Sequence, residues 1–222
     1  MREKEIVTYQ ELLKVRSGEN NEALVAVDQY AKNIIAQYQK MDMVPFTGDK
    51  IFVRDRVAQK IAEVNEALLR EREFRLKIVY GYRHPIVQER YFNELREKLA
   101  VSNPALSGDT LDALVHNFVA VPLVAGHPTG GAIDVTLITK EGDEVDMATR
   151  IADFGDSEKI KTFAENISER QNANRLVLRD ALLNGGFAPF NGEWWHFSYG
   201  DREWAFYYGE PESLYSPIEF KA

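Results

Sequence analysis

The stretch His127-Pro-Thr-Gly-Gly-Ala-Ile-Asp134 leads into an apolar run, residues 132–138, whose alternating pattern predicts a β-strand. Successive side chains of a strand point to opposite faces, so Ile133 and Val135 face a core while Asp134 faces the other way. A carboxylate in the middle of an apolar strand is unfavourable unless it is paired or bound to a metal ion. The stretch therefore predicts a sheet with a polar site on one face.

His127 precedes this aspartate across a loop that contains Gly130 and Gly131. Glycines allow a tight backbone path, which can return the loop over the strand. One interpretation is that His127 and Asp134 bind the same metal ion. The alternative, a loop histidine and a hydrogen-bonded aspartate, is equally compatible with this stretch alone.

A second stretch, Glu193-Trp-Trp-His196, adds another imidazole and another carboxylate. A histidine in such an aromatic run is more often a core residue than a ligand. Residues three apart in a flat strand face opposite sides, so Glu193 can reach the same site only from a preceding turn, which Gly192 permits. Two imidazoles and a carboxylate leave a fourth zinc position open for water, and a spare carboxylate can take its proton.

Arg83 ends a predicted strand, residues 76–82, between Gly81 and Pro85. A guanidinium stays charged and can hold a carboxylate or a developing oxyanion through two hydrogen bonds. An ordinary surface ion pair explains Arg83 equally well from the local sequence. The two remaining histidines, His84 and His116, have no recognisable acidic partner, and we predict structural or surface roles for both.

Composition excludes several classes of protein. The net charge is −8, from 27 basic and 35 acidic residues, which argues against a nucleic-acid partner. Cysteine is absent, so a metal site must use histidine, aspartate or glutamate. No run of residues is long and apolar enough for a membrane span, and the start of the chain lacks a secretory signal. We expect a cytoplasmic protein, or a periplasmic one if a signal peptide has been removed.

The pattern of elements predicts an α+β fold, with a small central antiparallel sheet flanked by helices and a zinc cleft on the sheet face. We expect one domain over residues 1–222, in which residues 1–50 form an extension that wraps the core. The clearest helix is residues 55–70, where apolar residues recur at helical spacing. Further helices are expected over residues 23–41, 86–99, 109–118 and, in two pieces, 158–183. A hairpin of two aromatic strands is expected over residues 194–199 and 204–208.

These motifs resemble a known family, the zinc D-alanyl-D-alanine dipeptidases of the VanX type, within the D-Ala-D-Ala metallopeptidases. The resemblance rests on Gly-Tyr-Arg at 81–83, on His-x-x-Gly-x-Ala-x-Asp from His127 to Asp134, and on Glu-x-Trp-His from Glu193 to His196. It spans roughly residues 50 to 208. The three motifs in this order are specific jointly and weak singly.

The resemblance implies a role for each motif residue. His127, Asp134 and His196 would hold one zinc ion per chain. Glu193 would activate water and later protonate the leaving amine, and Arg83 would stabilise the tetrahedral oxyanion. The substrate would be a small peptide, D-Ala-D-Ala or the end of a muropeptide.

The chain departs from the family pattern at three places. Ala125 stands where the family usually has serine, Tyr80 where it often has aspartate, and Ile151-Ala152 where it often has Phe-Asp. Family members use the serine and the latter aspartate near the free amine of the substrate. We name Asp153 as a substitute for that aspartate, and we expect further substrate contacts from Tyr82 and Trp195.

Three functions are compatible with these motifs and with the departures from the family pattern. The first is a zinc dipeptidase acting on D-Ala-D-Ala. The second is a zinc D,D-carboxypeptidase or peptidoglycan peptidase acting on longer muropeptides. The third is a metal-binding or wall-binding protein without catalysis, which the presence of Glu193 disfavours because no ligand role requires it.

Overall fold

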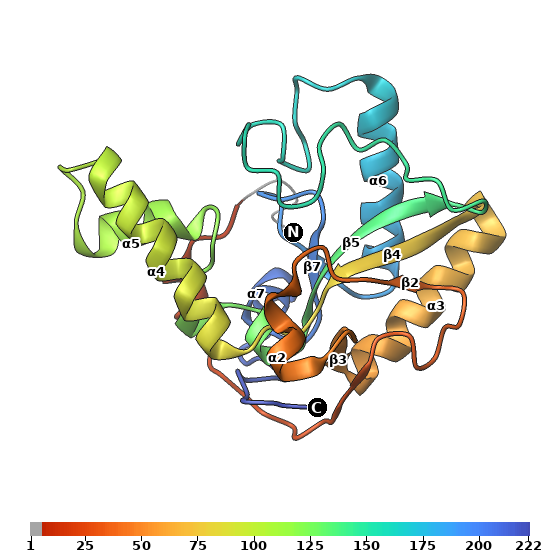
Figure 1. The fold of residues 1–222 in the computed structure, drawn as a ribbon, viewed down its shortest axis with the longest axis horizontal. Helices are drawn as coiled ribbons and strands as arrows, with labels where there is room; N and C mark the ends of the chain where they lie inside the picture. Colours follow the sequence, from red (N-terminus) through yellow and green to blue (C-terminus); the bar gives the residue numbers. More distant parts are fainter. Residues whose placement is uncertain (1–5) are drawn as a thin grey trace.

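The computed structural model describes residues 6–222 and has a mixed α+β architecture, as the sequence predicts (Figure 1). Within this part of the chain, every helix is too short or too polar to cross a lipid bilayer. The elements in chain order are α1 (Tyr9–Leu12), β1 (Leu24–Ala26), β2 (Ile35–Ala36), η1 (Met41–Met43), α2 (Val44–Thr47), β3 (Phe52–Arg54), α3 (Asp55–Arg72), β4 (Phe74–Tyr80), α4 (Pro85–Ser102), α5 (Gly108–His116), η2 (Pro122–Val124), η3 (His127–Thr129), β5 (Ala132–Thr139), α6 (Glu169–Asn184), β6 (Ala188–Pro189), β7 (His196–Ser198) and α7 (Arg202–Tyr208).

The main sheet has five strands in the order β2-β4-β5-β7-β6. All neighbouring strands are antiparallel except β2 and β4, which run parallel, so the predicted antiparallel sheet is correct apart from this edge. A separate two-stranded sheet pairs β1 with β3. In Figure 1, α3 and α6 lie along the central strands, while α4 and α5 project away from them.

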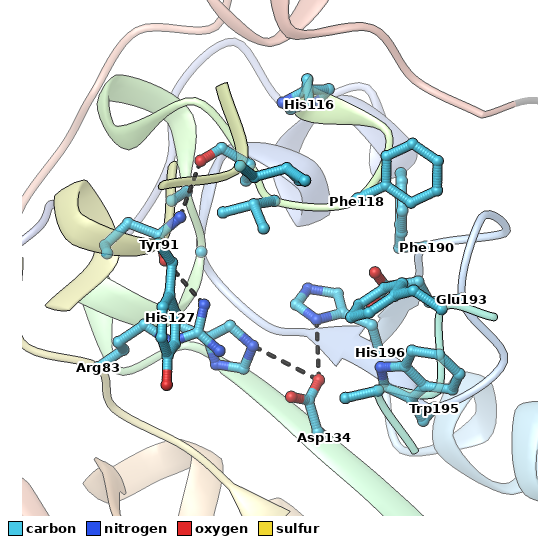
Figure 2. Close-up of a pocket in the computed structure, with 18 of the residues that line it drawn as sticks. Arg83, Tyr91, His116, Phe118, His127, Asp134, Phe190, Glu193, Trp195 and His196 are labelled. Carbon is cyan, nitrogen blue, oxygen red and sulfur yellow. Dashed lines mark hydrogen bonds and ion pairs between the residues drawn. The ribbon is translucent and has the colours of Figure 1, made fainter. Parts of the chain in front are cut away.

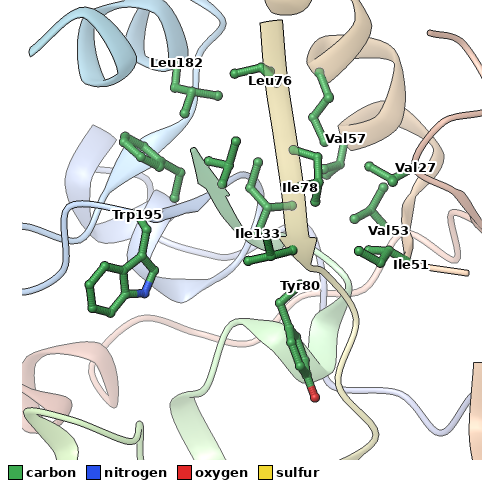
Figure 3. Packing of buried hydrophobic residues seen from close by; sticks show 14 of the residues in the cluster. Val27, Ile51, Val53, Val57, Leu76, Ile78, Tyr80, Ile133, Leu182 and Trp195 are labelled. Carbon is green, nitrogen blue, oxygen red and sulfur yellow. The ribbon is translucent and has the colours of Figure 1, made fainter. Parts of the chain in front are cut away.

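One face of β4 and β5 forms the hydrophobic core (Figure 3). Leu76 pairs with Leu137 and Ile78 with Val135, and these side chains are fully buried against residues of α3 and α6. Burying such side chains contributes about 1.5–3 kcal/mol each, so this face anchors the sheet. Asp134 projects from the opposite face of β5.

A register shift between Ile78 and Tyr80 changes the face of the last β4 residue. In a regular strand Tyr80 would share a face with Leu76 and Ile78, but here it lies opposite Asp134. An irregularity that adds a residue to one strand reverses the alternation of side chains beyond it. The tyrosine ring consequently lies beside the imidazole of His127, with the ring centroids 5.5 Å apart.

The helix predicted over residues 23–41 is wrong. This segment forms β1, a series of turns and β2. Its backbone groups bond to other segments: the Val27 amide donates to the Ile51 carbonyl, and the Gln37 amide donates to the Ile78 carbonyl. Val27, Ile34 and Tyr38 are buried from a segment whose backbone is extended or turned, so the helical spacing of the apolar residues does not indicate a helix here.

Two further predictions are corrected by helix caps. Of the two helical pieces predicted over residues 158–183, the second forms α6, where Ser168 and Gln171 make a capping box, whereas residues 158–167 form turns and bends. The predicted aromatic strand over residues 204–208 is the helix α7. Asp201 caps its start by accepting from the Trp204 amide, and Gly209 ends it in the left-handed conformation.

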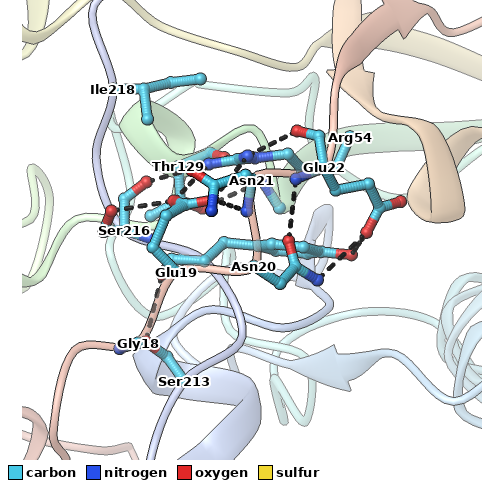
Figure 4. A network of polar contacts seen from close by, with 12 residues as sticks. Gly18, Glu19, Asn20, Asn21, Glu22, Arg54, Thr129, Ser213, Ser216 and Ile218 are labelled. Carbon is cyan, nitrogen blue, oxygen red and sulfur yellow. Dashed lines mark hydrogen bonds and ion pairs between the residues drawn. The ribbon is translucent and has the colours of Figure 1, made fainter.

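The buried Arg54 connects the N-terminal segment to the rest of the protein through hydrogen bonds (Figure 4). Arg54 is 1% exposed, and its guanidinium donates to the carboxylate of Glu19 and to the carbonyls of Glu22, Thr129 and Ser216. Arg54 therefore joins the N-terminal segment, the C-terminal segment and the loop that carries His127.

Candidate metal centre

The pairing of three strands places Asp134 at the centre of the site. In the sheet register, Asp134 of β5 lies directly opposite His196 of β7 on one side and opposite Tyr80 of β4 on the other. Directly opposed residues of antiparallel strands project from the same face, so their side chains meet. Residues far apart in the sequence are thus brought together by register.

His127 reaches this face from the short helix η3. Gly130 ends that helix with φ +75°, in the left-handed region that glycine adopts without strain. The Nδ1 of His127 lies 2.7 Å from the Gly81 carbonyl oxygen, and donation of its proton there leaves Nε2 as the free nitrogen. That Nε2 lies 3.4 Å from Asp134 Oδ1.

The second imidazole faces the same oxygen. His196 Nδ1 lies 3.1 Å from Asp134 Oδ1, and one ligand atom from each of the three residues lies within 4.8 Å of the others (Figure 2). All three residues are buried. Two imidazoles and one carboxylate converging in this way match the donor set of a three-ligand zinc site with one position open.

Each of these groups shifts the pKa of its neighbours. Burial by itself raises the pKa of Asp134, but the neighbouring imidazoles of His127 and His196 lower it well below its ordinary value. Burial lowers the pKa of His127, although the Asp134 carboxylate opposes this. Burial would also lower the pKa of His196, but Asp134 and Glu203 together raise it well above its ordinary value.

Glu193 lies in the turn before β7, as its spacing from His196 required. Its backbone amide donates to the Phe190 carbonyl, and its side chain lines the cavity beside the three candidate ligands. Burial, helped by the charges of Asp134 and Glu203, raises the pKa of Glu193 to about 8, against the opposing effect of His196. A carboxyl group with such a pKa can exchange protons near neutral pH.

Arg83 also lines the cavity, in the turn that follows β4. Its guanidinium carbon lies 4.5 Å from the ring centroid of Tyr80 and 5.4 Å from that of Tyr91, and one nitrogen donates to Gln88 at 2.9 Å. Cation–π contacts of this kind hold a buried guanidinium in place. Arg83 is therefore a fixed positive charge on the same face as Asp134.

The cavity has a volume of about 490 Å³ and continues along α4, past the metal group. Leu95, Lys98 and Leu99 line this continuation. Ala125 and Ala152, two of the positions that depart from the family pattern, also line the cavity. Cavities of roughly 300–1,000 Å³ are typical of small-molecule sites.

The three expected substrate contacts have different positions. Trp195 lines the cavity. Tyr82 is fully buried elsewhere, where its hydroxyl donates to the Ile218 carbonyl and accepts from the Phe220 amide. Asp153 lines a separate hollow and accepts from the Gly155 amide. Tyr82 and Asp153 therefore lie outside the lining of the cavity: Tyr82 bonds to the C-terminal segment, and Asp153 bonds within its own loop.

Two residues that line the cavity were not predicted as site residues from the sequence. His116 is buried and lines the cavity, with Nδ1 accepting from the Val121 amide, and Glu203 of α7 lines it from the side of His196. Neither residue stands in a recognisable motif, so only the fold could assign them. His84, by contrast, caps α4 and stacks on Phe46, in agreement with a structural role.

A family model described as D-ala-D-ala dipeptidase, Peptidase M15, matches residues 31–213. The chain belongs to this family. As an M15 peptidase, it is similar to the D-alanyl-D-alanine dipeptidase of a Synechocystis species, at 33% identity over 104 residues, which are 42% of this chain and 42% of the relative. It is also similar to the D-alanyl-D-alanine dipeptidase of Enterococcus faecium, at 38% identity over 79 residues, which are 35% of this chain and 38% of the relative. The matches thus span less than half the length of either relative.

Parts of this M15 peptidase also align with solved structures. The LdcB LD-carboxypeptidase aligns with 91% of this chain and 83% of its own, at 18% identity and a TM-score of 0.48. The D,D-dipeptidase VanXYg, in complex with a D-Ala-D-Ala phosphinate analogue, aligns with 88% of this chain and 66% of its own, at 18% identity and a TM-score of 0.41.

Proposed function

We propose that this protein is a zinc-dependent peptidase that hydrolyses the D-alanyl-D-alanine dipeptide. The observation that carries the proposal is the buried group of His127, Asp134 and His196, with Glu193 beside it in one cavity. Membership of the M15 family and the similarity to named D-alanyl-D-alanine dipeptidases support the choice of substrate.

Each side chain has a distinct part in the proposed reaction. Zinc, when bound, supplies Lewis acidity, which polarises a carbonyl oxygen and acidifies water. Glu193 accepts the proton of the attacking water and returns it to the leaving amine. Arg83 holds the negative charge that develops on the carbonyl oxygen, because its guanidinium is fixed and always charged.

A second candidate function is hydrolysis at the end of a longer muropeptide. The cavity, at about 490 Å³, is in the range that holds drug-sized ligands, which are larger than a dipeptide. In addition, alanine stands at 125 and 152, where the resemblance leads us to expect polar contacts to a free amine. A substrate whose amine is already acylated would not need those contacts.

One substrate panel tests both functions. The purified protein, with its zinc content measured, is incubated with D-Ala-D-Ala and with an N-blocked peptide that ends in D-Ala-D-Ala, and released D-alanine is quantified. The first function predicts release from the free dipeptide. Release from the blocked peptide alone supports the second function and excludes the first. Zinc binding without any release supports a binding protein.

We also propose that residues 1–222 form one metallopeptidase domain, with residues 1–50 wrapping the core. Pairing of β1 with β3, the addition of β2 to the main sheet, and the contacts between Glu19 and Arg54 support this arrangement. Residues 1–5 of the proposed extension lie outside the described residues.

A further inference from the structure

Glu203 is a buried carboxylate that neither the family motifs nor the proposed reaction uses. It belongs to α7, the short helix that follows β7, and only 8% of the residue is exposed. Its Oε2 lies 3.5 Å from Nε2 of His196 and, among the described residues, has no hydrogen-bond partner at ordinary distance. Burying a carboxylate is unfavourable unless a partner compensates for the lost hydration. The imidazole of His196 is the group placed to do so.

The two nitrogens of His196 consequently face two different carboxylates. Nδ1 lies 3.1 Å from Asp134 Oδ1, inside the metal group, and Nε2 points to Glu203, outside it. A neutral imidazole carries one proton, and the nitrogen without it is the metal ligand. An acceptor at Nε2 favours the tautomer with the proton there, which leaves the lone pair of Nδ1 directed at the metal position.

His127 shows the same arrangement with a different acceptor. Its Nδ1 is held by the Gly81 carbonyl oxygen at 2.7 Å, so Nε2 is the free nitrogen. The two candidate histidine ligands therefore use opposite ring nitrogens, and each has an acceptor behind it. A carboxylate acceptor raises the basicity of a ligating imidazole more than a carbonyl does.

We propose that Glu203 is a positioning residue for the metal ligand His196, whose Nε2 proton it accepts so that Nδ1 binds the cation. This inference rests on the proposed zinc site. The proposal adds a carboxylate behind the ligand His196. This carboxylate is supplied by α7, a helix that carries none of the three ligands.

The test is zinc affinity, measured by competition with a chromophoric chelator on the full chain, with circular dichroism as the check of folding. Glu203→Leu removes the acceptor and is expected to weaken zinc binding by about 10- to 100-fold. Glu203→Gln keeps an acceptor oxygen without the charge, so its loss should be smaller. A Leu variant that folds and keeps wild-type affinity would overturn the inference.

The matched control is Asp201→Asn. Asp201 is buried at the start of the same helix, but its carboxylate accepts from the Ser198 hydroxyl and the Trp204 amide. The Asp201→Asn variant should have the zinc affinity of the wild type, even if its free energy of unfolding is lower. Equal loss of zinc affinity in both variants would mean that any damage to α7 is sufficient, and would overturn the proposal.

A second readout does not depend on a variant that folds. Long-range proton–nitrogen NMR on the zinc-loaded wild type reports which ring nitrogen of His196 carries the proton. We expect the proton on Nε2, and a proton on Nδ1 would overturn the inference. If the wild type binds no zinc at all, the proposed metal site fails and this inference fails with it. If the wild type and the Glu203→Leu variant bind zinc equally well, the inference about Glu203 is wrong while the proposed metal site stands.

Discussion

At the residue scale, Glu193 lies beside the imidazoles without joining the group of His127, Asp134 and His196. We expect Glu193→Gln to lower kcat by about 10²- to 10⁴-fold, the usual contribution of a general base. Zinc content should not change, because no ligand is removed. D-alanine release and metal analysis on the same preparations check both parts, and an active Gln variant would exclude Glu193 as the base.

The same residue should make the metal-free protein sensitive to alkaline pH. Because the pKa of Glu193 is raised to about 8, the native state binds more protons than the unfolded state between the ordinary carboxyl pKa and pH 8. The contribution of Glu193 to stability therefore falls as pH rises through that window. Asp134, whose pKa is lowered, has the opposite effect: its contribution is present above the ordinary carboxyl pKa and is lost on acidification.

Urea unfolding of metal-free wild type and Glu193→Gln at pH 5 and at pH 8.5 measures the first effect. The variant should gain stability relative to the wild type at the higher pH, because glutamine has no proton to lose. An equal difference at the two pH values would contradict the raised pKa.

At the scale of elements, the turn between η3 and β5 depends on Gly130, with φ +75°. We expect Gly130→Ala to lower the free energy of unfolding by more than the roughly 1 kcal/mol that alanine costs in this conformation. The added methyl would also collide with Leu24 of β1. Because the turn holds His127, zinc affinity should fall as well.

Gly209→Ala is the matched control for this turn. Gly209 has φ +74°, and a Cβ there would meet nothing within 4 Å. Urea unfolding and chelator competition on both variants separate backbone strain from the collision. Equal destabilisation of the two, with unchanged zinc affinity, would show that the η3 turn tolerates the extra methyl.

At the scale of the whole molecule, Arg54 joins segments from both ends of the chain to the loop of His127. Arg54→Leu leaves the partly exposed carboxylate of Glu19 and several carbonyls without their donor. Breaking a fully buried ion pair typically costs about 3–5 kcal/mol, and we expect a loss at the lower end of that range because the remaining Glu19 carboxylate reaches solvent. Urea unfolding measures it.

Arg56→Leu serves as the control for Arg54, because Arg56 is exposed two residues further along. Exposed substitutions usually change stability by less than about 0.5 kcal/mol. A similar small effect in both variants would contradict the role assigned to Arg54 in fastening the N-terminal segment.

The sequence-based predictions failed at one segment that depends on distant contacts and at another where helix caps outweigh the residue composition. Residues 23–41 carry apolar residues at helical spacing, yet they form extended segments whose backbone groups bond to neighbouring strands. Residues 204–208 are aromatic, as strands often are, yet Asp201 and Gly209 make them a helix. Glu203 lies just before that predicted strand and was given no role, so its position in α7 behind His196 could not be foreseen.

The sequence by itself determined the local chemistry: the helix of residues 55–70, the face of Asp134 on its strand, the glycine loop between His127 and Asp134, and the residue types fit for a metal. These follow from periodicity and backbone preference, which act between neighbours in the chain. Only the tertiary structure decided the convergence of His127, Asp134 and His196, the acceptor behind each imidazole and the walls of the cavity. Those depend on strand register and on burial by distant segments, which no local pattern encodes.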